Sequence, residues 1–215
     1  MCACANVCIK SVEIMTGTYP SILLEDAVNQ FASLPSVGRK TALRLVLHLL
    51  RQPAENIHRF AAAVNGLADS IHYCRTCMMV SDGEQCGICA DQRRDHDTIC
   101  VVESVRDVLS IEATGQYHGV YHVLGGIISP IDGIGPSDLT IKELVARAAA
   151  GKEIILALSG DVEGETTAFY IYRQVEGSGC TVTTLARGLG FGDDLEYADS
   201  LTLGRSIVAR QPFKP

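Results

Sequence analysis

Four cysteines in the middle of the chain, spaced C-x2-C-x8-C-x2-C, constrain its local fold more than any other feature of the sequence. They are Cys74, Cys77, Cys86 and Cys89. Each C-x2-C pair can close a tight knuckle that points two sulfurs at one place, and two knuckles supply the four thiolates that Zn2+ prefers. The spacing therefore predicts one structural Zn2+ per chain. Because four thiolates complete a tetrahedral shell, this metal is expected to fold the segment and to activate no water.

Two disulfides are the alternative use of the same cysteines. Nothing else in the sequence indicates a secreted protein, and small disulfide-stapled domains belong to oxidising compartments, so we favour the metal site. His72 and His96 flank the cluster and could replace a cysteine as ligands. With four thiolates available, both histidines are expected to face solvent.

The chain of 215 residues, 47% of them hydrophobic, is long enough to bury a core. No apolar run reaches the length of a membrane span, and the start lacks the pattern of a secretion signal, so we expect a cytoplasmic protein. Residues 1–18 are predicted to be a leader that is disordered or untranslated. Its cysteines, Cys2, Cys4 and Cys8, could form a second metal site, but they lack a fourth thiolate nearby.

The net charge of -7 is unevenly distributed along the chain. Residues 36–60 carry five lysines and arginines against one acid, whereas from Val101 onward nine lysines and arginines face fifteen acids. The basic stretch is suited to binding phosphate. The acidic remainder would repel phosphate and could instead bind a basic protein or a divalent cation.

Two helices joined by a short turn are predicted in the basic stretch. Ser21 can cap the first helix, residues 34–38 form the turn, and the second helix runs over residues 39–50. This is a helix-hairpin-helix arrangement. The usual motif has glycine at the position of Ser36, so a side chain there is expected either to hold the turn slightly away from the phosphate or to force φ to a less favourable value.

The physical logic of such a hairpin is that turn N–H groups, here those around Gly38, and the positive end of the second helix meet a DNA phosphate. Arg39, Lys40 and Arg44 would lie alongside that phosphate. The contact would be independent of base sequence. An ordinary helical hairpin with a solvated basic face is the alternative interpretation.

Beyond the cysteines, apolar strands alternate with helices, which predicts right-handed crossovers and a parallel sheet. The expected strands cover residues 98–102, 119–124, 153–158 and 181–186, and the expected helices cover residues 105–113, 139–150 and 166–175.

Acidic residues follow two of these strands, at the edge where parallel sheets place their functional loops. Glu103 ends the first strand, and Asp161, Glu163 and Glu165 follow the third. Their oxygens could share one Mg2+ and polarise a phosphodiester. They could equally cap the helix that follows, whose positive end favours carboxylates without any ion.

The order of these parts resembles the RecR family of bacterial recombination mediators, over nearly the whole chain from about Tyr19 to Arg210. Besides the hairpin and the four-cysteine finger, the resemblance is carried by three motifs: VVESVRD at 101–107, VEGETT at 162–167, and LEYAD at 195–199 with TLGR at 202–205. Family members begin close to the equivalent of Met15, so Met15 is the expected start.

The resemblance implies an α/β fold with an N-terminal helix-hairpin-helix, a small C4 zinc finger, a Toprim-type parallel-sheet domain and a C-terminal helical extension. The corresponding segments are 19–72, 73–97, 98–190 and 191–215, after the leader. It also implies a DNA-binding mediator without catalysis. Such proteins form rings, commonly tetramers, that encircle DNA and act with RecO and RecF to load RecA at single-stranded gaps.

Carried over residue by residue, Lys40 and Arg44 line the DNA passage, and Glu103, Asp107 and Glu163 belong to the surface that binds RecO, a basic partner. The family's acidic block lacks the full triad of Toprim enzymes, and Asp161 only partly restores the D-x-D pair. A Mg2+-dependent Toprim nuclease or nicking enzyme is therefore the alternative hypothesis.

The C-terminal stretch 188–199 resembles a Walker B element, with Gly190 where a proline is common. No phosphate loop accompanies it in the sequence, because Lys40 is not preceded by the required glycine frame. We therefore expect this stretch to be structural and to bind no ATP.

Overall fold

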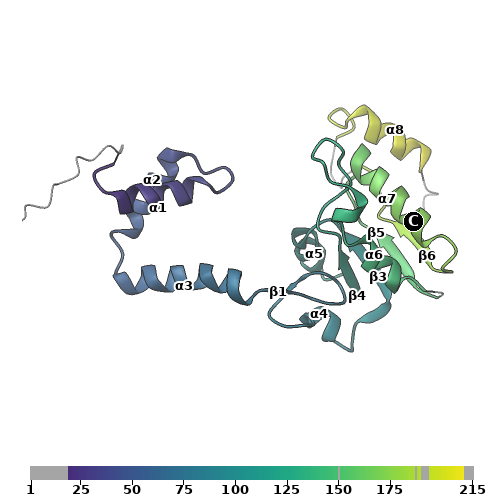
Figure 1. Cartoon of the computed structure of the whole chain (residues 1–215). Coiled ribbons are helices and arrows are strands. Elements are labelled where there is room, and N and C mark those ends of the chain that lie inside the picture. Colours follow the sequence, from purple (N-terminus) through teal and green to yellow (C-terminus); the bar gives the residue numbers. More distant parts are fainter. Residues whose placement is uncertain (1–18, 150, 187, 190–193, 211–215) are drawn as a thin grey trace, which may run out of the picture. The chain divides into compact units, whose positions relative to one another are not determined.

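The computed structural model describes residues 19–149, 151–186, 188–189 and 194–210. The predicted leader with its three cysteines, and the part of the Walker-B-like stretch at 190–193, lie outside these residues. The chain forms two compact units, which divide between Asp69 and Ser70 (Figure 1). Among the described residues, no helix is both long and apolar enough to cross a membrane.

The helices, in chain order, are α1 (Ile22–Ala32), α2 (Arg39–Leu49), α3 (Ala54–Ser70), α4 (Gly87–Ala90), α5 (Val105–Glu112), the 3-10 turn η1 (Pro136–Asp138), α6 (Ile141–Arg147), α7 (Val162–Val175) and α8 (Ser200–Val208). The strands are β1 (His72–Tyr73), β2 (Val80–Ser81), β3 (Asp95–Val102), β4 (Gly119–Val123), β5 (Glu153–Leu156) and β6 (Thr181–Thr184).

The first unit is built on the predicted helical hairpin. Helices α1 and α2 pack through Val28, Ala42 and Val46, all of which are buried. The turn between them holds Ser36 at a φ of 65°, in the left-handed region that favours glycine, so the expected backbone conformation is confirmed. Helix α3 follows, and Phe60 stacks on Phe31 of α1 with ring centroids 6.3 Å apart.

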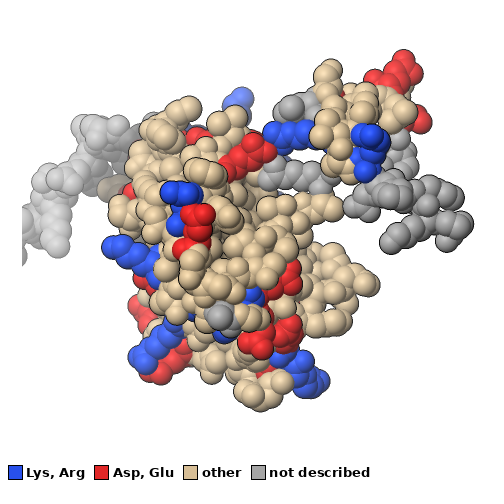
Figure 2. All heavy atoms as spheres, turned by 90° about the vertical axis from the view of Figure 1, so that its right-hand side faces the viewer, with Lys and Arg blue, Asp and Glu red and all other residues tan. Residues whose placement is uncertain are grey.

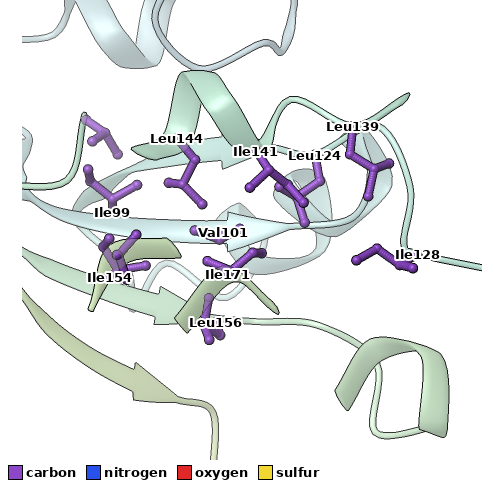
Figure 3. Packing of buried hydrophobic residues seen from close by; sticks show 12 residues of the cluster. Ile99, Val101, Leu124, Ile128, Leu139, Ile141, Leu144, Ile154, Leu156 and Ile171 are labelled. Atoms are coloured by element: carbon purple, nitrogen blue, oxygen red, sulfur yellow. The ribbon is translucent and has the colours of Figure 1, made fainter. Parts of the chain in front are cut away.

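The second unit contains a four-stranded sheet in the order β4-β3-β5-β6, with every neighbouring pair parallel. Alternate residues of β3 point to opposite faces, as the strand period requires. Ile99 and Val101 join a core under α6 and α7 (Figure 3). Cys100 and Val102 join a second core under α5.

The four-cysteine segment packs against this second face. Its residues Met79 and Ile88 contact both the cysteine cluster and the core around Cys100. The Val123 N–H of edge strand β4 also donates a 2.8 Å hydrogen bond to the Cys77 carbonyl. The segment therefore covers an edge of the sheet that would otherwise present unpaired backbone groups.

Two helices differ in extent from the sequence expectation. Helix α7 begins at Val162, four residues before the predicted start, because Asp161 acts as its N-cap and accepts a 2.7 Å hydrogen bond from the Gly164 N–H. Helix α6 is shorter than predicted at both ends. It begins at Ile141, because Leu139 is extended and Thr140 is the N-cap, and it ends at Arg147, because Ala148 is extended. The last residue of the predicted helix, Ala150, lies outside the described residues.

Candidate functional site

The four predicted metal ligands come together in the second unit. The Sγ atoms of Cys74, Cys77, Cys86 and Cys89 all lie within 4.8 Å of one another, and no cysteine of the four is more than 6% exposed. None of these four cysteines forms a disulfide in the structure. The four cysteines can therefore hold one metal ion, and the donor set fits a tetrahedral thiolate site.

Local backbone geometry creates the two knuckles. In the first, the Cys74 N–H donates to the Met79 carbonyl at 2.7 Å, and Met78 turns the chain with a φ of 62°. In the second, Cys86 caps the short helix α4, and the Cys89 N–H donates to the Cys86 Sγ at 3.5 Å. His72 and His96 are exposed, as expected.

The protonation of the thiols reflects their crowding. Burial acts to raise the pKa of Cys74, but backbone N–H groups of three neighbouring residues outweigh it and lower that pKa to about 6. Burial raises the pKa of Cys86 to about 11, and the hydrogen bond with Cys89 raises that of Cys77. A bound divalent cation would stabilise all four as thiolates.

A basic groove lies along α2 in the first unit. It has a volume of about 360 Å3 and is lined by Lys40, Leu43, Arg44, Leu47, His48 and Arg51. Lys40, Arg44 and His48 recur every four residues and so share one face of the helix. Among the described residues that line the groove, none is acidic. We refer to these six residues below as the basic groove.

The structure separates the four residues that the sequence assigned to DNA. Lys40 and Arg44 lie together in the basic groove. Arg39 instead donates to the Asn29 side-chain oxygen at 2.7 Å and so ties α2 to α1. Gly38 is the N-cap of α2, and a Cβ there would meet no described atom within 4 Å.

His48 and Arg51 were not among the predicted site residues. His48 continues the four-residue spacing of Lys40 and Arg44 by one turn. The sequence therefore contained the signal for His48. Arg51 lies seven residues after Arg44, just beyond the end of α2, so the helix alone did not predict its place in the groove.

The acids at the sheet edge are placed by hydrogen bonds within the chain. The Ser159 N–H donates to Glu103 Oε1 at 2.6 Å, which ties the end of β3 to the loop after β5. Asp107 accepts from both the N–H and the hydroxyl of Ser104, at 2.8 and 2.9 Å, at the start of α5. Glu163 is half-buried in the first turn of α7.

These carboxylates do not reproduce the compactness of the cysteine site. Among the described residues, the four cysteines form a group of potential metal ligands whose ligand atoms all lie within 4.8 Å of one another, and the carboxylates form no such group. On the face of the second unit turned toward the viewer in Figure 2, acidic and basic side chains lie interspersed among uncharged ones.

Comparison with known proteins matches three family descriptions along the chain. "RecR, helix-hairpin-helix" covers residues 24–67, "Toprim domain" covers 97–186 and "RecR, C-terminal" covers 188–211. The chain is 58% identical to the recombination protein RecR of Porphyromonas gingivalis, over 93% of this chain and 97% of that protein. The chain belongs to the RecR family. The RecR proteins of Bacteroides thetaiotaomicron and Flavobacterium johnsoniae are 56% and 54% identical, over 93% and 91% of this chain and 98% and 96% of theirs.

Membership of the RecR family confirms the predicted fold class. The helix-hairpin-helix match covers most of α1, all of α2 and the basic groove, and the Toprim match covers the parallel sheet except the first two residues of β3. The four cysteines lie between these two matches. As a RecR protein, the chain is a recombination and repair protein.

Proposed function

We propose that this chain binds DNA through the basic groove and acts as a non-catalytic mediator of recombinational repair. The observation that carries the proposal is the groove itself, in which Lys40, Arg44 and Arg51 gather three permanent cations without a lining acid. The N-terminus of α2, which carries the positive end of the helix dipole, begins directly after Gly38, one residue before Lys40. Such a surface attracts phosphate and carries no information about base sequence.

In this role the chain would assemble into a ring, commonly a tetramer, that encircles DNA in the cytoplasm. It would act with RecO and RecF to load RecA at single-stranded gaps. The acid-rich second unit is suited to a basic partner such as RecO, with Glu103, Asp107 and Glu163 as the docking residues. Among the described residues, the Glu163 carboxylate accepts no hydrogen bond from the chain, which supports its availability to a partner.

We further propose that the cysteine cluster holds one structural Zn2+. The metal would fix both knuckles and, through Met79 and Ile88, the face of the sheet on which the finger packs. Since all four ligand positions are filled by sulfur, the ion would perform no chemistry.

The test is a DNA-binding titration by fluorescence anisotropy with labelled single-stranded and gapped DNA. The variant is Lys40→Ala/Arg44→Ala. The control, Arg59→Ala/Arg75→Ala, removes the same charge outside the groove, where Arg59 bonds Asn56 and Arg75 pairs with Glu84. We expect the groove variant to lose at least tenfold in affinity and the control to lose far less. Equal losses in both variants would remove the assigned role of the groove.

A cleavage assay tests the absence of catalysis. Supercoiled and gapped DNA are incubated with Mg2+ or Mn2+ and either the unaltered protein or its Glu103→Gln variant. Intact DNA with both proteins is expected, because Glu103 and Asp161 serve hydrogen bonds at the ends of β3 and α7. Cleavage that disappears in the variant would make the protein a Toprim nuclease.

A further inference from the structure

The cysteine cluster poses a problem of charge. Four thiolates around one divalent cation carry a net charge of -2, and every cysteine of the four is buried. Burying an ionic group without compensation costs several kcal/mol. N–H donors from the finger supply part of the compensation, notably to Cys74 and Cys86.

Three arginines of the finger and its exit are already paired with acids. Arg75 pairs with Glu84 at 2.8 Å, Arg93 with Asp91 at 2.8 Å and Arg94 with Glu112 at 2.5 Å. Their positive charge is therefore offset locally, and the first two pairs have an arginine that is largely exposed. None of the three is a good source of charge for the buried cluster.

Arg147, the last residue of α6, is differently placed. Its guanidinium donates to the Tyr121 carbonyl at 2.8 Å and lies 3.1 Å from His122 Nδ1. Both partners are neutral, because burial lowers the pKa of His122 to about 4. Within the described part of the chain, no carboxylate lies within the 4.0 Å of a salt bridge to Arg147.

The guanidinium and the finger meet on the same strand edge. The Tyr121 carbonyl that binds Arg147 and the Val123 N–H that binds the Cys77 carbonyl both belong to β4. Residues two apart on a strand point their backbone groups to the same edge and are separated by about 7 Å. Arg147 therefore contacts the edge of β4 two residues before the point where the first cysteine knuckle binds it.

Electrostatics agree with this placement. Burial lowers the pKa of the Arg147 guanidinium, and Cys89, Cys77 and Cys74 act in the opposite direction. Three of the four thiols are thus close enough to interact electrostatically with Arg147. Arg147 is half-buried, and the Tyr121 carbonyl and His122, its hydrogen-bond partners, are neutral.

We propose that Arg147 balances the charge of the metal–thiolate cluster and fastens α6 to the finger across the outer edge of β4. The residue is a positioning residue and no metal ligand, and the role rests on the proposed metal site. Its consequence is that metal affinity depends on a side chain of helix α6, outside the finger. Metal binding in turn would stabilise the edge of that sheet.

The test measures Zn2+ affinity by competition with a chromophoric chelator, in the full-length protein. Arg147→Met removes the charge and keeps much of the length, Arg147→Lys keeps the charge, and Arg94→Met breaks a neighbouring ion pair away from the thiols. We expect Arg147→Met to weaken Zn2+ binding 10- to 100-fold, as loss of an outer-sphere partner does. Arg147→Lys should recover most of the loss, and Arg94→Met should bind Zn2+ like the unaltered protein.

Urea unfolding of each protein with and without Zn2+ separates this role from ordinary packing. A packing role alone would lower stability equally in both conditions, whereas a charge role lowers the stabilisation that Zn2+ adds. Unaltered affinity in Arg147→Met, or an equal loss in Arg147→Lys, would overturn the proposal. Failure of the unaltered protein to bind Zn2+ would be a different result, since it removes the metal site as well.

Discussion

Gly164 allows a direct test of how tightly the acidic edge of the sheet is packed. A Cβ added at this position in the first turn of α7 would lie 2.3 Å from Ser159 Oγ and 2.4 Å from the Ser159 carbonyl oxygen. Contacts under about 3 Å require movement, and here the backbone itself would have to move. It is held, because the Ser159 N–H is bound to Glu103 Oε1 at 2.6 Å.

Overpacking of this kind costs about 1–3 kcal/mol, from which the better helix propensity of alanine recovers at most about 1 kcal/mol. We therefore expect Gly164→Ala to lower the free energy of unfolding by about 1–2 kcal/mol. For a chain of 215 residues this corresponds to a fall in Tm of about 2–8 °C.

Thermal and urea unfolding followed by far-ultraviolet circular dichroism measures the change, since the chain has no tryptophan. The matched control is Gly204→Ala in the middle of α8, where a Cβ would meet no described atom within 4 Å. That substitution should be neutral or slightly stabilising. If Gly164→Ala proved as stable as the unaltered protein, the edge would be looser than the contacts indicate.

Three further predictions concern single side chains. His122 is fully buried with a pKa of about 4 in place of the ordinary 6.5, so it contributes stability above pH 6.5 that is lost as the pH falls toward 4. The loss is about 3 kcal/mol, and in His122→Gln, followed by urea unfolding across this range, the stability should fall less with acid than in the unaltered protein. Glu103→Ala leaves the Ser159 N–H without its acceptor and should cost about 1.5–3 kcal/mol in urea unfolding, whereas Glu103→Gln should cost clearly less; equal losses would show that the hydrogen bond contributes little. Cys86→Ser, or treatment of the unaltered protein with a strong chelator, should release the metal and lower the Tm markedly, since structural zinc sites contribute about 10 kcal/mol or more of apparent binding free energy. Pure protein without one zinc per chain by metal analysis would contradict that prediction.

The features that sequence predicted best are those set by local spacing. The two C-x2-C pairs fix where the four sulfurs meet, and helical periodicity fixes α1 and α2. The positive φ of Ser36 was also predictable, because the usual motif has glycine at this position of the turn and any other residue there is strained. These features depend on residues close together in the sequence, so the sequence alone is enough to predict them.

Features set by tertiary contacts were not predictable in the same way. The sheet order, with β4 at one edge, depends on the pairing of strands far apart in sequence. The docking of the finger depends on the packing of Met79 and Ile88 against the sheet and on the hydrogen bond from Val123 to Cys77, and no spacing reveals these contacts. The extra turn of α7 arises because Asp161 caps the helix, a role that sequence alone could not distinguish from metal binding.

If DNA phosphates bind in the basic groove, the affinity for DNA must depend on salt concentration through Lys40 and Arg44. The slope of log K against log salt is negative. Each phosphate contact that is removed reduces its magnitude by about 0.9 for duplex DNA and by about 0.7 for single strands. We predict that Lys40→Ala/Arg44→Ala reduces the magnitude of the slope by about 1.8 on duplex DNA, while Arg59→Ala/Arg75→Ala leaves it nearly unchanged. An unaltered slope in the groove variant would contradict the account.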